Sequence, residues 1–291
     1  MSGVLVLEQG LNGLQLGLML FLMAAGLTLV LGIMDMINLA HGSLYMVGAY
    51  LAAAIAQASG SFLVAVLGAL AATAVIGMLL ELVLLRRLYG RDHLSQVLAT
   101  FAVLLIANEL VRIVWGAQPV MLNTPAALSG PVELIGGLRY PSYRLLIIVT
   151  GLAVALALYL LVTRTRIGMW VRAGASDREM AMAMGVDIRT LFTWIFGIGA
   201  ALCAVAGALL GPLLAVQVGM GESILIPAFV VVVIGGIGSI RGAFLGALLV
   251  GFVDTLGRAS NLGPALASIL IYVLMAGVLF WRPQGLFPAR A

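Results

Sequence analysis

A short polar segment interrupts an otherwise apolar stretch near the start of the chain. It reads Asp35-Met-Ile-Asn38-Leu-Ala-His41-Gly42-Ser43. Its carboxylate, amide, imidazole and hydroxyl groups can all form hydrogen bonds, and such groups are costly in apolar surroundings unless they pair or line water. Two interpretations stay open. Either Asn38, His41, Gly42 and Ser43 line a route for a polar solute, or His41 forms a structural hydrogen bond in the interior.

Residue types that carry catalysis are otherwise sparse. His41-Gly42-Ser43 is the only hint of a serine nucleophile, and no partner base is placed near it. The absence of lysine excludes a P-loop nucleotide site and Schiff-base chemistry. The single cysteine, Cys203, excludes an intrachain disulfide and a cysteine-based zinc site. His41 and His93 lack the spacing of a zinc protease. We therefore expect no enzyme, no metal site and no cofactor.

A second distinctive segment, residues 176–185, contains alternating methionine and alanine. Ser176 and Glu179 have capping-box spacing, and Gly185 can end a helix as its C′ residue. This pattern predicts a helix of about two turns, too short to span a membrane. Met180 and Met184 fall on one face and offer a soft apolar surface for a groove on another protein. The alternative is an ordinary solvated helix in a loop.

The composition shows which kind of structure must position these segments. Hydrophobic residues make up 63% of the 291 residues and charged residues only 9%, and the mean hydropathy is +1.20. A soluble domain is about half apolar and a quarter charged, so the chain is predicted to be an integral membrane protein in contact with lipid. The net charge of +4 does not indicate a nucleic-acid partner, because the arginines lie between apolar runs and serve as topology signals.

Nine apolar runs approach the length of about 20 residues that a membrane-spanning helix needs. They cover residues 11–33, 42–58, 62–85, 94–114, 143–163, 191–213, 222–239, 242–258 and 262–281. The run 42–58 is short, so it is a full, a tilted or a re-entrant segment, and the expected number of spans is eight or nine. No linker divides the chain. The fold predicted for residues 1–291 is therefore one all-α polytopic transmembrane helical bundle.

The positions of the arginines predict the orientation. Clusters at 86–91, in the loop 164–190 and at 282–290 all fall on one side of the predicted spans, and arginine-rich loops are cytoplasmic. The C-terminus is then cytoplasmic, in a bacterial inner membrane. The loop 115–142 lies outside, and its four prolines predict irregular or short-stranded structure. With nine spans the N-terminus lies outside, and with eight it lies inside. No basic residue precedes Arg86, so we predict no signal peptide.

Small residues and paired charges within the spans predict helix packing. Three glycine pairs have the small-x-x-x-small spacing that lets helix backbones approach closely in lipid: Gly13 with Gly17, Gly207 with Gly211, and Gly242 with Gly246. They serve either bundling within the chain or a seam between subunits. Two ion pairs are expected from their spacing, Glu109 with Arg112 and Asp254 with Arg258, and Glu81 either extends its carboxylate toward water or pairs with Arg86.

Several runs, in order along nearly the whole chain, resemble one family. They are Gly26-Leu-Thr-Leu-Val-Leu-Gly32, Ile37-Asn-Leu-Ala-His-Gly42, Met46-Val-Gly-Ala-Tyr50, Arg164-Thr-Arg-Ile-Gly168 with Arg172-Ala173, Gly235-Gly-Ile-Gly-Ser239 with Gly242-Ala243, and Arg282-Pro-Gln-Gly-Leu-Phe287. The family is that of the branched-chain amino-acid ABC transporter permeases, specifically the LivH-type subunit. It also includes permeases for urea and short-chain amides.

The resemblance implies a permease that works with a related second permease subunit or with itself, two ABC ATPases and an external solute-binding protein. ATP then binds only to the partner subunits. The residues that the resemblance assigns to ATPase coupling are Ser176, Asp177, Glu179, Met180, Ala183, Met184 and Gly185. The turn of Asn38, His41, Gly42 and Ser43 becomes a candidate part of the translocation path. Relatives often carry a proline before the glutamate, and its absence here puts the start of the helix in doubt.

Three alternatives to amino-acid import stay open. In the first, the solute is urea or a short-chain amide, and the class of protein is the same. In the second, the chain is a stand-alone channel or secondary carrier, which predicts a filter or a line of ionisable residues. In the third, the chain is an intramembrane protease, which needs a nucleophile with a placed partner. The sequence displays neither of the patterns that the second and third alternatives need.

Overall fold

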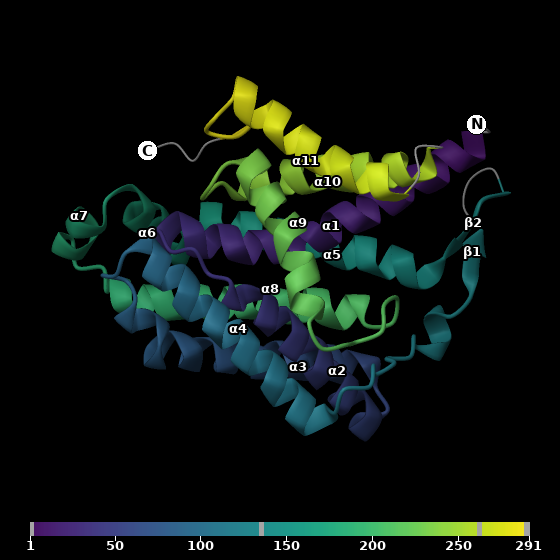
Figure 1. Ribbon diagram of the computed structural model, residues 1–291, viewed down its shortest axis with the longest axis horizontal. Coiled ribbons are helices and arrows are strands. Elements are labelled where there is room, and N and C mark those ends of the chain that lie inside the picture. Colours follow the sequence, from purple (N-terminus) through teal and green to yellow (C-terminus); the bar gives the residue numbers. More distant parts are fainter. Residues whose placement is uncertain (1–2, 134–136, 261–263, 288–291) are drawn as a thin grey trace.

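The computed structural model describes residues 3–133, 137–260 and 264–287. In that part of the chain it confirms the predicted all-α bundle (Figure 1). The helices are α1 Gly3–Met34, α2 Ala40–Ser59, α3 Phe62–Val83, α4 His93–Trp115, α5 Ser142–Arg164, α6 Arg166–Ser176, α7 Arg178–Ala183, α8 Ile188–Leu210, α9 Met220–Gly235, α10 Ile240–Ala259 and α11 Pro264–Trp281. Two short 3-10 helices, η1 Leu85–Arg87 and η2 Ala126–Leu128, lie in the connections.

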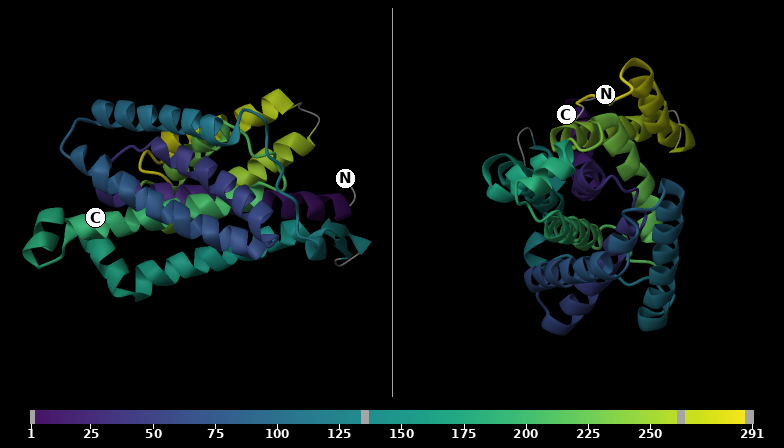
Figure 2. Two further views of the ribbon diagram at one scale, coloured as in Figure 1. Left: turned by 90° about the horizontal axis from the view of Figure 1, so that it is seen from below. Right: turned by 90° about the vertical axis from the view of Figure 1, so that its left-hand side faces the viewer.

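Helix α1 lies at the centre of the bundle (Figures 1 and 2). It packs against α10, α8, α9 and α5, and α8 in turn packs against α2 and α3. Residues 16–34 of α1 are almost entirely apolar and almost entirely buried. A helix that is apolar all round its circumference is stable only where protein or lipid surrounds it on every side, which accounts for its central place.

The loop 115–142 is irregular, as its prolines predict. Its described part contains η2 and a small antiparallel hairpin of β1 (Pro131–Glu133) and β2 (Arg139–Pro141), in which Val132 lies opposite Tyr140. This loop lies at one end of the long axis of the molecule, and α6 and α7 lie at the other end (Figure 1). The two loops predicted on opposite sides of the membrane are therefore separated by the length of the bundle.

Each apolar run of the sequence corresponds to one described helix over most of its length, and residues 262–263 of the last run lie outside the described residues. Among the described residues, six helices are long and apolar enough to cross a membrane by length and composition: α1, α3, α4, α5, α8 and α10. Helices α9 and α11 contribute shorter apolar stretches. The run 42–58 forms α2, which packs against α8, α3 and α9 inside the bundle. The expected eight or nine spans and the side of the C-terminus stay predictions.

Glycines allow α1 and α10 to approach each other closely. A Cβ atom on Gly13 would come 2.7 Å from Cδ1 of Phe252, and one on Gly17 would come 2.9 Å from the carbonyl oxygen of Ala247. A Cβ on Gly251 would meet the backbone of Gly17. Backbone cannot move aside as a flexible side chain can, so only glycine fits at this crossing.

The other two glycine pairs also pack within the chain. A Cβ on Gly207 would meet the carbonyl oxygen of Tyr45 in α2, and one on Gly246 would come 2.9 Å from the carbonyl oxygen of Val231 in α9. Gly242 faces Gly235 at the end of α9. Gly211 follows α8 and faces Leu122 of the outer loop rather than another helix. These contacts favour the interpretation that the glycines bundle the helices of one subunit.

Both expected ion pairs form, and so does the pair of Glu81 with Arg86. Arg112 lies 3.2 Å from Glu109, and Arg258 lies 2.8 Å from Asp254. Arg86 lies 3.2 Å from Glu81, whose side chain is fully buried. The Glu81 carboxylate also accepts hydrogen bonds from the hydroxyls of Tyr89 and Thr193, each at 2.6 Å. Because Thr193 lies on α8, this cluster ties α3 to α8 near the α6–α7 end.

Candidate functional site

Helices α6, α7 and α8 are each capped by the side chain of the residue that precedes them. Thr165 accepts a hydrogen bond from the N–H of Gly168 at 3.1 Å, and Asp177 accepts one from the N–H of Met180 at 2.9 Å. Asp187 accepts from the hydroxyl of Thr190 at 2.6 Å, and this bond lowers the pKa of the Asp187 carboxyl. Such caps satisfy backbone donors that a helix start leaves free, so the segment 164–190 has a defined shape.

The expected start of the short helix is wrong. Ser176 is the last residue of α6, and the N-cap of α7 is Asp177. The Ser176-x-x-Glu179 capping box therefore does not form. Aspartate caps as well as serine does, and in this chain Asp177 lies between two helices that meet at a bend. Sequence spacing alone cannot choose between two adjacent capping residues.

The expected end of the helix is confirmed. Gly185 has a φ of +87°, a left-handed conformation that glycine adopts without strain. The N–H of Val186 donates to the carbonyl of Ala181 at 3.0 Å, and the N–H of Gly185 donates to that of Met182 at 2.9 Å. These two bonds form a Schellman motif, which satisfies the last carbonyls of α7.

Helix α7 exposes methionine at the tip of the molecule. Met180 is 60% exposed, Met182 is 53% exposed and Met184, immediately after the helix, is 80% exposed. Ala181 between them is buried, where α7 packs against α6 and α8. The figures show α7 at the far end of the molecule, beyond the ends of the long helices (Figures 1 and 2). Sequence analysis singled out Met180 and Met184 but not Met182.

The polar segment between α1 and α2 begins at the surface with the exposed Asp35 and continues into the interior. Asn38 and His41 have no exposed surface, and Ser43 has almost none. The amide oxygen of Asn38 accepts from the N–H of Ala40 at 3.0 Å, and the Ser43 hydroxyl donates to the carbonyl of Ala40 at 2.7 Å. These bonds shape the start of α2. No hydrogen-bond partner among the described residues reaches either ring nitrogen of His41 or the amide nitrogen of Asn38.

Glycines on two helices make room for the His41 ring. It fits between α1 and α8, where a Cβ on Gly26 would come 2.7 Å from its Nε2 and one on Gly199 would come 3.0 Å from its Cε1. The ring of Phe196 lies edge-on, 6.1 Å away between centroids. The structural hydrogen bond that one interpretation gave to His41 therefore does not occur among the described residues.

Helix α9 closes the turn from one side. A Cβ on Gly42 would lie 2.7 Å from the carbonyl oxygen of Gly221, so the first turn of α2 touches the first turn of α9 backbone to backbone. The next residue, Glu222, is exposed and accepts a hydrogen bond from the amide of Asn108 in α4 at 2.7 Å. Sequence analysis missed Glu222 and Asn108. An ionisable residue at the start of an apolar run is a functional signal and could have identified Glu222.

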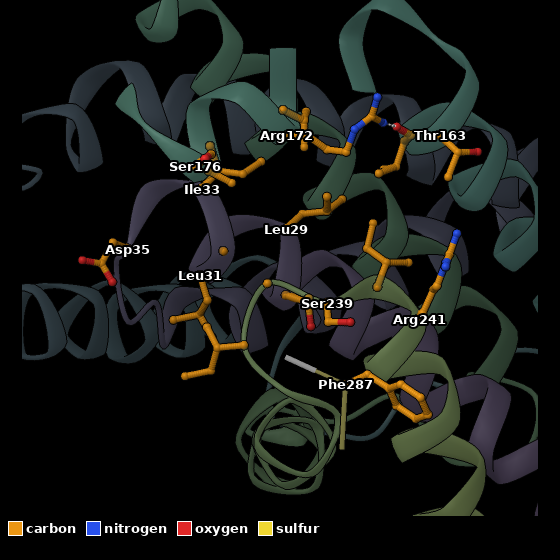
Figure 3. A pocket seen from close by; sticks show the side chains of 18 of the residues that line it. Leu29, Leu31, Ile33, Asp35, Thr163, Arg172, Ser176, Ser239, Arg241 and Phe287 are labelled. Atoms are coloured by element: carbon orange, nitrogen blue, oxygen red, sulfur yellow. Dashed lines mark hydrogen bonds between the residues drawn. The ribbon is translucent and has the colours of Figure 1, made fainter. Parts of the chain in front are cut away.

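A large cavity opens at the α6–α7 end, with a volume of about 1030 Å³. Residues from the end of α1, from α5 and α6, from the α9–α10 turn and from the C-terminal tail line it (Figure 3). None of Asn38, His41, Gly42 and Ser43 lies on its wall. Asp35, at the start of the polar segment, does line the cavity, but the enclosed residues 38–43 have no contact with it in this conformation.

The fold and these features define a class of protein. A bundle of apolar helices with polar residues in its interior and a short, capped helix exposed at one end is the architecture of a polytopic membrane protein. The family model described as "Branched-chain amino acid transport system / permease component" matches residues 10–279. The chain belongs to this family of membrane transport permeases.

Curated relatives agree over almost the full length. The chain is 32% identical to the high-affinity branched-chain amino acid transport system permease protein BraD of Pseudomonas aeruginosa, over 96% of this chain and 95% of the relative. It is 32% identical to the permease protein LivH of Escherichia coli K12, over 96% and 94%. A probable LivH of Methanocaldococcus jannaschii is 28% identical, over 92% and 88%.

Proposed function

We propose that the chain is the membrane-spanning permease subunit of an ATP-driven ABC importer for branched-chain and other hydrophobic amino acids. The names of BraD and LivH, which match nearly end to end, support this solute class. The importer is expected in the bacterial inner membrane. An external solute-binding protein delivers the amino acid to the end that carries the 115–142 loop.

One of the two ATPase subunits docks at the opposite end, on the surface formed by Met180 and Met184 with their neighbours Asp177, Glu179 and Ala183. The observation that carries this proposal is that α7 holds its methionines out of the bundle on a rigidly capped segment. Methionine side chains adapt to the groove of a partner protein, and Gly185 sets the direction in which the chain returns to α8. Movement of the ATPase is then transmitted from α7 through Gly185 to α8.

The polar turn is a closed part of the translocation path. Asn38 and His41 have buried polar atoms without a hydrogen-bond partner among the described residues. Burial of an unpaired polar group costs free energy. A second state of the protein, in which a solute supplies the missing hydrogen bonds, would account for their presence. Separation of Gly42 from Gly221 would open the turn toward Glu222 and Asn108 and let a solute reach it. ATP can drive this exchange only if the partners bind the open and closed states with different affinities.

The permease core pairs this chain with a related second subunit or with another copy of itself. Purification of the tagged chain from its native membrane tests the whole assembly. We expect two ATPases and either one related permease or a doubled copy of this chain. Recovery of the chain without any ATPase would contradict the proposal.

Transport by reconstituted vesicles separates the candidate functions. We expect leucine uptake only when the ATPases, ATP and the binding protein are all present. Uptake of urea or acetamide in preference to leucine would favour the amide permease, a branch that the family resemblance also allows. Uptake by vesicles that contain this chain alone would establish a channel or a secondary carrier and exclude the proposal.

The double variant Asn38→Ala with His41→Ala tests the path. We expect leucine flux to fall about tenfold, because two hydrogen bonds to the solute contribute roughly 1 kcal/mol each or somewhat less. The amount of protein in the membrane should change far less. Thr73→Val is the matched control, because it also removes a buried polar group that has no partner among the described residues, here a hydroxyl outside the turn. Equal flux in the double variant and the wild type would leave the turn with a structural role only.

A further inference from the structure

The cavity at the α6–α7 end carries an excess of positive charge. Four arginines, Arg172, Arg178, Arg241 and Arg282, line it together with one carboxylate, that of Asp35. Figure 3 shows Arg172 and Arg241 on the same side of the cavity and Asp35 on the far side. The charges are therefore unequal in number and also separated in space, so one wall of the cavity attracts anions.

These arginines have no carboxylate partner. No salt bridge to any of the four occurs among the described residues. Arg241 lies over the ring of Tyr159, 5.3 Å from its centroid, and donates to the Tyr159 hydroxyl at 3.5 Å. Arg172 donates to the carbonyl oxygen of Val162. Both guanidinium groups are thus held in place with donors still available, and their planar forks suit the oxygens of a phosphate.

The surroundings of the cavity are apolar. Tyr159, Ile237 and Phe287 on its wall are 42%, 58% and 46% exposed. Helix α6 beside it exposes Met169 and Trp170 at 52% and 41%. A helix with apolar and tryptophan side chains on one face and arginines flanking it is typical of the membrane interface. The site therefore combines a cationic wall with apolar surface, the two kinds of surface that a lipid headgroup and its acyl chains would contact.

We propose that this cavity binds the phosphate headgroup of an anionic phospholipid from the cytoplasmic leaflet. Arg172 and Arg241 hold the phosphate, and the acyl chains lie along Tyr159, Ile237 and the exposed face of α6. A zwitterionic amino acid has no net charge and gains little from such an excess of cations, so the transported solute is a poor occupant. Basic pockets between helices on the cytoplasmic side suit anionic lipid headgroups.

Native mass spectrometry of the intact importer, titrated with defined lipids in detergent, tests the proposal. We expect phosphatidylglycerol to bind in preference to phosphatidylcholine. The double variant Arg172→Gln with Arg241→Gln should weaken phosphatidylglycerol binding about thirtyfold, since each arginine near an anionic headgroup contributes roughly fivefold. Arg172→Lys with Arg241→Lys should keep most of the binding, which shows that the subunit still folds.

Arg164→Gln with Arg166→Gln is the matched control. It removes two arginines from the same end of the molecule that do not line the cavity. We expect it to change binding less than about threefold, because exposed surface charges are screened by salt. A loss equal to that of the cavity variant would overturn the proposal. Displacement of the lipid by an equal concentration of inorganic phosphate would also overturn the proposal, because it indicates that the site binds a free anion. Exclusion of the lipid by the assembled ATPases would overturn it as well, because it indicates that a protein covers the cavity.

Discussion

In importers that carry both Met180→Asp and Met184→Asp, we expect the rate of ATP-driven uptake to fall at least about thirtyfold. Each exposed methionine contributes apolar surface to the contact with the ATPase, and central residues of such contacts commonly contribute about 2 kcal/mol. A carboxylate at each position would also have to lose its water in the docked state. The chain itself should still reach the membrane, because both side chains lie outside its core.

Uptake of labelled leucine, ATP hydrolysis and co-purification of the ATPases should be measured on the same preparations. We expect the ATPases to be lost from the complex or to hydrolyse ATP without uptake. Met180→Leu with Met184→Leu is the control, since it keeps an apolar surface of similar size, and it should transport nearly as well as the wild type. Normal uptake by the aspartate variant would show that the ATPases dock elsewhere.

Gly207→Ala is expected to destabilise the chain strongly. The added carbon would overlap the carbonyl oxygen of Tyr45 and lie 3.1 Å from the backbone nitrogen of Ala49, both in α2. Overpacking of this kind costs about 1 to 3 kcal/mol or more, and the backbone atoms of α2 leave little room for relaxation. In a chain of this size we expect the midpoint of thermal unfolding to fall by about 5 °C or more.

Two other glycines in helices serve as controls for the same substitution. A Cβ atom on Gly10 in α1 or on Gly277 in α11 would meet nothing within 4 Å. Gly10→Ala and Gly277→Ala should therefore leave the unfolding midpoint unchanged or raise it, because alanine favours helix over glycine by about 0.5 to 1 kcal/mol. Thermal unfolding followed by tryptophan fluorescence in one detergent compares all three. If Gly207→Ala unfolds at the same temperature as these controls, the close contact of α8 with α2 is not essential.

The described contacts connect α7, the proposed docking surface, to the interior. Helix α7 leads through Gly185 and the Asp187 cap into α8, and α8 contains Gly199, which packs against His41. The Glu81 carboxylate ties Thr193 of α8 to α3 through hydrogen bonds. A force applied at α7 therefore acts on a helix that contacts the polar turn, without an intervening flexible loop.

The amino-acid sequence by itself determined the class of fold and the location of the long apolar helices, but it did not predict α6, which lies in the segment expected to be a loop. A membrane span needs a long, uninterrupted apolar stretch, and this requirement is local, so composition and length reveal it without knowledge of neighbours. The same holds for the C′ position of Gly185, the irregular loop 115–142 and the ion pairs at short spacing, each of which depends on residues close together in the chain. The family followed from short runs in a fixed order.

Only the tertiary structure decided which polar groups are accessible and what they contact. The sequence could not show that His41 lies between Gly26 and Gly199, that Gly42 touches Gly221, or that Asn108 bonds to Glu222, because each contact joins residues far apart in the chain. It also could not gather arginines from α6, α7, α10 and the C-terminal tail around one cavity. In an apolar sequence many helix faces are equivalent, and the packing of glycines against backbone selects among them.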